Sequence, residues 1–200
     1  QICPIKIIED DSKFVDSYPE DDIAWDGSNY SDVQEIEAAF NHARSIDSSV
    51  FEYLALPSQT EWDGMSAQAQ GLYLVNSERQ ARGIKPFEGA SQNVIDIAQA
   101  YSGYIRSNDL VIDHYYNGTP RDRFDTDPEM YGNSNGIKYP ESIFSIEGVG
   151  VNLTHTEAVI QSVYGWIYVD KYPLGGGAWG HRDQLLQTGL NEDYGSNSRE

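Results

Sequence analysis

The sequence predicts an α+β fold, because segments with helical periodicity alternate with short apolar segments that lack it. Helical periodicity is found in four segments, namely 32–46, 66–82, 91–107 and the residues that follow Thr156. The short extended segments are Ile5–Ile8, Phe51–Leu56, 141–153 and the residues that follow Gly180. At 200 residues the chain is long enough to form one well-packed core.

The first predicted helix covers residues 32–46. Ser31 and Gln34 have the spacing of a capping box. The apolar residues that recur at helical spacing after them are Val33, Ile36, Phe40 and Ala43. His42 lies on this helix without a carboxylate pair at ligand spacing, so we interpret it as a surface or packing histidine.

A short strand, Phe51–Leu56, is predicted before the second helix, which covers residues 66–82. Gly83 ends this helix, because glycine is the preferred residue just after a helix C-terminus. Arg79 and Arg82 lie near that end, and we expect them on the surface or in salt bridges.

The third helix, 91–107, is capped by Ser91 and has the most regular apolar face of the chain. Residues 109–140 then form a loop-rich segment, and loops of this length inside a compact domain are usually functional or mobile. Thr156 caps the last predicted helix. A run of glycines after that helix leads to a predicted strand that begins near His181.

The composition is strongly acidic, with 32 Asp and Glu residues against 13 Lys and Arg residues and a formal net charge of −19. This charge argues against nucleic-acid binding, which needs the opposite sign. No apolar run approaches the roughly 18 to 20 residues of a membrane-spanning helix, so we expect no transmembrane segment. The chain starts at Gln1 without a signal peptide, which we interpret as a processed, mature N-terminus.

Two acidic runs, Glu9–Asp11 and Glu20–Asp22, lie in the first 30 residues. The simpler interpretation is a solvated extension, and the alternative is an arm that binds calcium or a partner. The single cysteine, Cys3, excludes an internal disulfide and is either a free thiol or an inter-chain link.

Two stretches resemble the CAP superfamily, the domain shared by cysteine-rich secretory proteins, antigen 5 and pathogenesis-related proteins. One is Leu74-Val75-Asn76-Ser77-Glu78-Arg79 with the following Gly83 and Pro86, and the other is Gly180-His181-Arg182. The lack of disulfides favours the bacterial, SCP-like branch of that family. The resemblance implies an α-β-α sandwich with a small antiparallel sheet between helix layers. It also implies an acidic N-terminal extension with one helix, 1–60, followed by a CAP/SCP-like domain, 61–200.

The resemblance implies a cleft formed by His114, Glu141 and His181. The family's fourth acid falls at Val169, with Asp170 next to it. Two imidazoles and a carboxylate would suit zinc with an open water position, and they could equally serve as a general acid and base. A third interpretation is a hydrogen-bonded cluster in which Glu141 orients the imidazoles.

Three function classes remain open on this basis. The first is a secreted or cell-surface protein, not an enzyme, that binds an ion, a small ligand, a lipid or a partner through the His114/Glu141/His181 cleft. The second is a metal-assisted hydrolase or peptidase that uses the same three residues. The third is a structural subunit of an extracellular assembly.

The resemblance also implies a closing strand after the Gly-His-Arg segment. Residues Thr188–Glu200 are polar and form a poor strand. We therefore expect a cleaved but still bound C-terminal fragment, or a neighbouring subunit, to supply that strand.

Overall fold

The computed structural model describes residues 18–50, 52–90, 92–125, 142, 153–171 and 179–186. Several sequence predictions concern residues outside these ranges. They are the Ile5–Ile8 strand, the state of Cys3, the role of Glu141, the extended segment 143–151 and the character of Thr188–Glu200.

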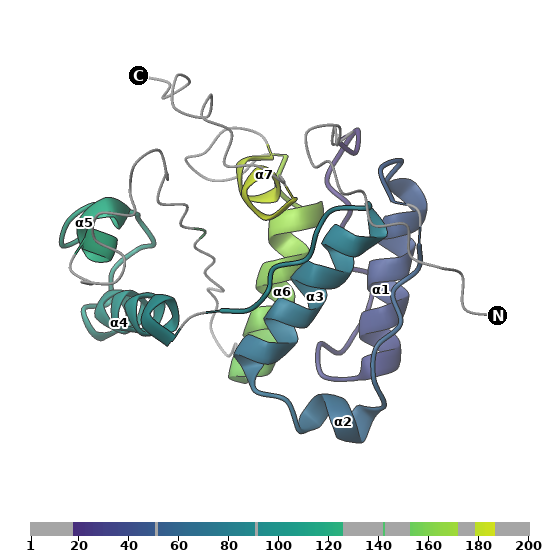
Figure 1. Ribbon diagram of the computed structural model, residues 1–200, viewed down its shortest axis with the longest axis horizontal. Coiled ribbons are helices and arrows are strands. Elements are labelled where there is room, and N and C mark those ends of the chain that lie inside the picture. The colour runs from purple at the N-terminus through teal and green to yellow at the C-terminus, as the bar shows by residue number, and fades with distance from the viewer. Residues whose placement is uncertain are drawn as a thin grey trace. The chain divides into compact units, whose positions relative to one another are not determined.

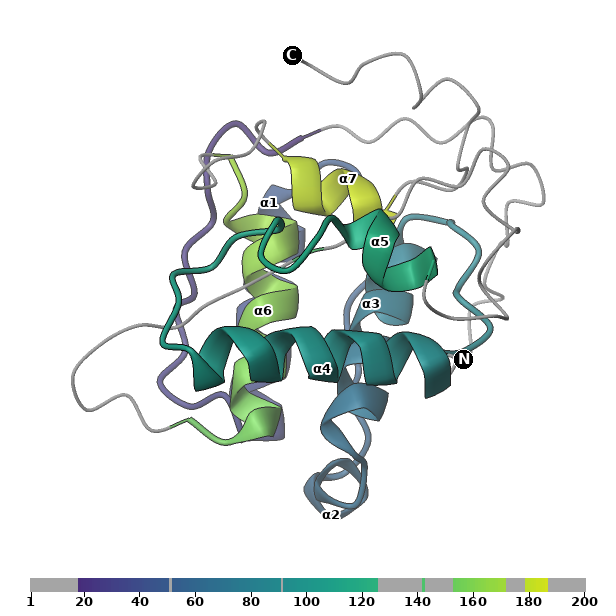
Figure 2. The ribbon, with the colours of Figure 1, turned by 90° about the vertical axis from the view of Figure 1, so that its left-hand side faces the viewer.

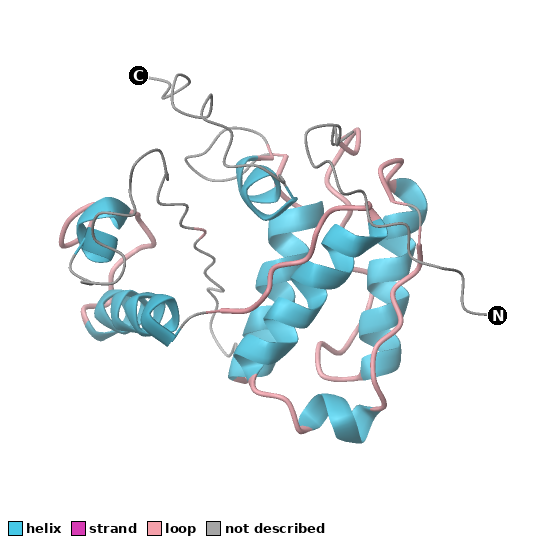
Figure 3. Cartoon of the chain, in the orientation of Figure 1, coloured by secondary structure: helices cyan, strands magenta, loops and turns pink. Residues whose placement is uncertain are grey.

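Every regular element in the described ranges is a helix, as Figure 3 shows by colour. The helices are α1 (Val33–Ile46), α2 (Gln59–Asp63), α3 (Ala67–Ala81), α4 (Gln92–Ser107), α5 (Pro120–Asp125), α6 (His155–Tyr168) and α7 (Gly180–Leu186). They belong to two compact units. Unit 1 spans residues 1–87 and 146–188, and unit 2 spans residues 88–145 and 189–200. The domain boundary predicted at residue 60 stays a prediction.

The core of unit 1 lies between α1, α3 and α6, which run side by side in Figure 1. Helix α7 lies across one end of α3 and α6, as Figures 1 and 2 show. Phe40 of α1 packs edge-to-face on Tyr164 of α6, with 5.2 Å between ring centroids. Trp25 packs on the same Tyr164 ring at 5.0 Å. Other buried members of this core are Ile36, Trp62, Leu74, Ile160, Ile167 and Leu186. Residues before position 60 therefore share one apolar core with α3 and α6.

Unit 2 contains α4 and α5, joined by the loop that carries His114. Tyr101 is the buried residue of α4. The Arg123 guanidinium lies over the Tyr101 ring, 3.5 Å from its centroid. Arg123 also donates hydrogen bonds to the backbone carbonyls of His114 and Gly118, at 2.9 and 3.0 Å. One arginine thus holds the loop between the two helices.

The predicted α+β class, with its CAP-like α-β-α sandwich, is wrong for the described part of the chain. No strand or sheet is present in those ranges, where all regular structure is helical. The prediction of a missing closing strand depended on a sheet, and the described residues form none, so that prediction has lost its basis.

In the described part of the predicted strand Phe51–Leu56, residues 52–56, no strand forms and the backbone groups pair with side chains. Asn41 of α1 accepts a hydrogen bond from the Leu54 N–H at 2.6 Å and donates one to the Leu54 carbonyl at 2.9 Å. Glu37 accepts from the Leu56 N–H at 2.5 Å. These side chains satisfy backbone groups that a second strand would otherwise satisfy, so no ladder forms here.

The strand predicted to begin near His181 is helix α7. Arg182 and Leu186 are fully buried, whereas Gln184 between them is exposed. A strand would place all three residues on one face, while a helix places residues 182 and 186 together and residue 184 on the other side.

The four predicted helices are confirmed as α1, α3, α4 and α6, with small shifts at the caps. Asp32, not Ser31, caps α1 and accepts hydrogen bonds from the backbone of Gln34 and Glu35. Thr154, two residues before the predicted cap, caps α6 in a capping box with Glu157. Gly83 ends α3 with φ of +74°, a conformation that favours glycine.

Candidate functional site

The candidate site is a pair formed by Asp170 and His181, which α6 and α7 bring together. Helix α6 ends at Tyr168, and Asp170 follows two residues later. The Asp170 carbonyl accepts a hydrogen bond from the Trp179 N–H at 2.7 Å, just before α7 begins. His181 is the second residue of α7, so its position depends on the end of α6.

The Asp170 carboxylate contacts both the ring and the backbone of the first turn of α7. Its Oδ1 lies 2.7 Å from His181 Nδ1. Its Oδ2 accepts hydrogen bonds from the backbone N–H groups of His181, at 2.8 Å, and Arg182, at 3.2 Å. The Asp170 side chain is 3% exposed and the His181 side chain 21% exposed. The pair therefore has a buried acid and a histidine that solvent can reach.

The geometry assigns the tautomer of His181. A carboxylate accepts hydrogen bonds, so Nδ1 carries the proton in the neutral ring and Nε2 presents a lone pair. Nε2 has no hydrogen-bond partner among the residues that the structure describes. The same carboxylate–histidine arrangement orients histidines that bind metals and histidines that act as bases.

Aromatic side chains surround the pair. The Trp166 ring of α6 lies 6.4 Å from the His181 ring, centroid to centroid. Tyr18 stacks on Trp179 at 6.1 Å, and its hydroxyl donates to Asp183 at 2.7 Å. The segment at Tyr18 therefore covers part of the start of α7.

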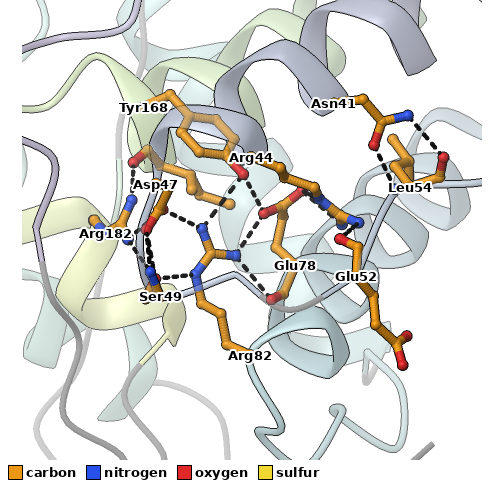
Figure 4. A network of polar contacts seen from close by, with 11 residues as sticks. Asn41, Arg44, Asp47, Ser49, Glu52, Leu54, Glu78, Arg82, Tyr168 and Arg182 are labelled. Carbon is orange, nitrogen blue, oxygen red and sulfur yellow. Dashed lines mark hydrogen bonds and ion pairs between the residues drawn. The ribbon is translucent and has the colours of Figure 1, made fainter.

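Behind the pair, Arg182 enters a buried ionic network (Figure 4). Its Nη2 lies 2.7 Å from Asp47 Oδ2, and the same oxygen lies 2.7 Å from Arg82 Nη2. Arg82 Nη1 lies 2.6 Å from Glu78 Oε2, and Arg44 Nη2 lies 2.8 Å from Glu78 Oε1. Tyr168 donates its hydroxyl hydrogen to Glu78 at 2.6 Å, and Ser49 also belongs to the network. Three guanidinium groups thus share two carboxylates.

The charges of this network decide the protonation of its acids. Burial alone would raise the pKa of Asp47, but Arg82 and Arg182 outweigh burial and lower it to about 2. Burial likewise opposes ionisation of Glu78, and Arg44 and Arg82 nevertheless lower its pKa. Burial and the Glu78 charge raise the pKa of Tyr168. At neutral pH both acids are therefore charged and Tyr168 is a neutral donor.

His114 lies in unit 2, in the loop between α4 and α5. Its side chain is half-buried, and its ring lies 6.4 Å from that of Tyr115. Its carbonyl accepts from Arg123, so its backbone is held in place. His114 and His181 thus belong to different compact units, and Glu141 lies outside the described residues. The predicted set of three stays a prediction.

In the described ranges, no three or more His, Cys, Asp and Glu side chains form a group that could hold a metal ion. Zinc binding by His114, Glu141 and His181 stays an untested prediction. Calcium binding by the acidic run Glu20–Asp22 stays an untested alternative. In the structure Lys171 pairs with Asp21, at 2.5 Å, and its backbone N–H donates to Asp22.

Of the other two histidines, His42 lies on the surface, one of the two positions that the sequence predicts for it, and His155 is exposed as well. His42 is exposed and lies 3.7 Å from Asp26, which is also half exposed. His155 is the exposed first residue of α6. Neither has a buried carboxylate partner of the kind that His181 has.

Sequence reasoning missed the partner of His181 and the network behind it. Asp170 was noted only as the neighbour of Val169, although an acid at that place was the available signal. Arg82 was expected on the surface or in a salt bridge, and it is paired but fully buried. Asp47 has a local partner in Ser49, but its arginine partners are 35 and 135 residues away, so the sequence did not indicate its place in the network.

Comparison of this chain with protein-family models, curated proteins and solved structures finds no match. None of the described helices is long and apolar enough to cross a membrane.

Proposed function

We propose that this protein is a secreted or cell-surface binding protein of the bacterial CAP type, without catalysis of its own. It binds an ion or a small ligand through His181. The observation that carries the proposal is the 2.7 Å contact between Asp170 and His181 Nδ1, because it directs Nε2 outward as an acceptor.

The local chemistry favours a partner that donates to nitrogen. A neutral imidazole binds zinc and similar divalent ions through Nε2, and Asp170 fixes the ring and its tautomer from the Nδ1 side. A ligand with an N–H or O–H group is the alternative partner of the same lone pair. The arrangement of a buried carboxylate behind an accessible histidine is compatible with a divalent ion and with a ligand that donates a hydrogen bond.

The two stretches that resemble the CAP family also lie against each other in unit 1. Arg79 of α3 donates to the Leu185 carbonyl of α7 at 2.7 Å. Arg82 of α3 and Arg182 of α7 share Asp47. This proximity supports the family proposal, which now rests on these helices and not on a sheet.

Zinc titration of single histidine variants tests the proposal, in a Cys3→Ser background that removes the thiol as a ligand. The chain has four histidines, so the set is complete with His42→Ala, His114→Ala, His155→Ala and His181→Ala. We expect calorimetry to show zinc binding that His181→Ala abolishes and that His42→Ala and His155→Ala leave unchanged. Equal zinc stoichiometry in all four variants would overturn the assignment.

A second candidate is a metal-assisted hydrolase or peptidase, because an Asp–His pair is also the arrangement of a general base. An activity screen with ester and peptide substrates separates the two. Turnover that disappears in both His181→Ala and Asp170→Asn would replace binding by catalysis as the function.

A further inference from the structure

Helix α7, which carries His181, is too short to hold itself in place. It has seven residues and begins with glycine, whereas isolated helices shorter than about 12 to 15 residues are marginal in water. Glycine lowers helix propensity further. The position of His181 relative to Asp170 must therefore be set by contacts with the rest of unit 1.

Those contacts act at three places along α7. Asp170 accepts from the backbone N–H groups at its start. Arg79 donates to the Leu185 carbonyl near its end. Between them, Arg182 points into the core and is fully buried.

The Arg182 contacts fix α7 most strongly, because each involves a buried group. Nη1 donates to the Ile167 carbonyl of α6 at 2.8 Å. Nη2 donates to Asp47 Oδ2 at 2.7 Å and to Ser49 Oγ at 3.3 Å. The planar guanidinium thus joins α7 at once to α6 and to the turn after α1, with a directionality that a lysine ammonium lacks.

Arg182 directly follows His181 on the helix, so a shift of one residue moves the other. Consecutive helical residues point about 100° apart, which lets Arg182 face the core while His181 faces solvent. The Asp170 contact to the ring is short, and a displacement of about 1 Å would break it. The position of the buried Arg182 therefore affects the contact between His181 and Asp170, although Arg182 takes no part in that contact.

We propose that Arg182, held by Asp47, is a positioning residue that keeps His181 in register with Asp170. This inference rests on the proposed function in that His181 is the binding residue. It goes further by assigning the Arg182–Asp47 pair a role in presenting Nε2 of that histidine. Arg182 touches no ligand and acts through His181.

The test is Arg182→Lys, with Arg44→Lys as the matched control. Arg44 is an equally buried arginine of the same network, but it pairs with Glu78 and with the Glu52 carbonyl, away from α7. The readout is the ¹⁵N chemical shifts of the His181 imidazole, which distinguish the Nδ1–H from the Nε2–H tautomer. We expect Nδ1–H to dominate in the unmodified protein and in Arg44→Lys, and the Nε2–H form to become comparably populated in Arg182→Lys.

Both variants will lose stability, so the tautomer and not the melting temperature decides. A tautomer that is the same in both variants would overturn the proposal. If Arg182→Lys fails to fold, Asp47→Asn replaces it, since it removes the charge that holds Arg182 while keeping the shape of the side chain. An unchanged tautomer in folded Asp47→Asn would again overturn the proposal.

Zinc titration of the same variants separates this inference from the proposed function. We expect Arg182→Lys to weaken zinc binding up to about tenfold, the lower end of the effect of losing a direct second-shell partner. If His181→Ala leaves zinc binding intact while Arg182→Lys still shifts the tautomer, the proposed function fails and the positioning role stands. If His181→Ala abolishes binding while Arg182→Lys changes neither tautomer nor affinity, the positioning role fails alone.

Discussion

Both compact units are organised around arginines, but the arginines meet different partners. In unit 1, Arg82 and Arg182 are fully buried and pair with the carboxylates of Glu78 and Asp47. In unit 2, Arg123 is half-buried, lies over the Tyr101 ring and donates to backbone carbonyls. The first is a charge network inside an apolar core, and the second is a single cation that holds a loop.

This difference determines what each arginine does for stability. A buried charge that loses its partner stays in a low-dielectric environment at high cost. A backbone carbonyl that loses a half-exposed arginine can bind water instead. We therefore expect changes in the unit 1 network to unfold the unit, and changes at Arg123 to loosen one loop.

The largest expected effect comes from Glu78→Gln. The substitution keeps the shape of the side chain but leaves Arg44 without its carboxylate and Arg82 with Asp47 alone, which costs about 3–5 kcal/mol of unfolding free energy. Urea unfolding followed by circular dichroism measures the change. Glu52→Gln is the matched control. Arg44 contacts only the backbone carbonyl of Glu52, and the Glu52 carboxylate points away from the network (Figure 4). A loss of unfolding free energy below about 1 kcal/mol in Glu78→Gln would show that the network contributes little to the stability of unit 1.

Acid should weaken the same network by a predictable amount. Asp47 has its pKa lowered to about 2 from an ordinary 3.8. A lowered pKa contributes stability that is fully present above the unfolded-state value and is lost as the pH falls toward the folded-state value. The shift corresponds to about 2 kcal/mol, lost between about pH 4 and pH 2, and the lowered pKa of Glu78 acts in the same direction.

Unfolding free energies at pH 7 and pH 2.5 check this dependence, with Asp47→Asn as the comparison. The variant is less stable at pH 7, and it should lose less stability on acidification than the unmodified protein. Parallel pH profiles for the two proteins would contradict the assigned pKa.

In unit 2, Arg123→Gln should cost about 1–2 kcal/mol, the sum of a cation–π contact and net hydrogen bonds to carbonyls. The effect should be local. Amide hydrogen exchange of residues 113–118 should accelerate while exchange in α3 stays unchanged. Acceleration throughout both units would show that Arg123 supports more than its loop.

The existence of the long helices could be predicted because their signals are local. The apolar period of α4 and the caps of α3 and α6 lie within one or two turns of the residues they affect. Two of the three short helices in the described ranges, α2 and α5, carried local signals as well. Ser58 and Glu61 form a capping box at α2, and Thr119 and Asp122 have the same spacing at α5.

The sheet was predicted wrongly because extended backbone and paired backbone look alike in a sequence. At Leu54 and Leu56 the partners are the Asn41 and Glu37 side chains, 13 and 19 residues away. At α7 the spacing of Arg182 and Leu186 fits one face of a helix and one face of a strand alike, and the preceding glycine run favoured a strand. Of the candidate site, His181 was identified from its motif, whereas its pairing with Asp170 depends on how α6 meets α7.

The smallest expected effect compares the same cap chemistry in the two units. Thr154 caps α6 and Thr119 precedes α5, and each threonine hydroxyl contacts an acid three residues later at 2.8 Å. Replacing either threonine with alanine removes one capping acceptor, worth about 1 kcal/mol. Since α6 belongs to the core of unit 1, Thr154→Ala should lower the global unfolding free energy by that amount. Helix α5 has six residues, so Thr119→Ala should speed amide exchange at 119–125 and leave the urea midpoint of unit 1 unchanged. If Thr119→Ala instead lowers that midpoint as much as Thr154→Ala does, the two units unfold together. The buried charge network of unit 1 and the loop held by Arg123 in unit 2 would then differ in their contacts but not in their stabilities.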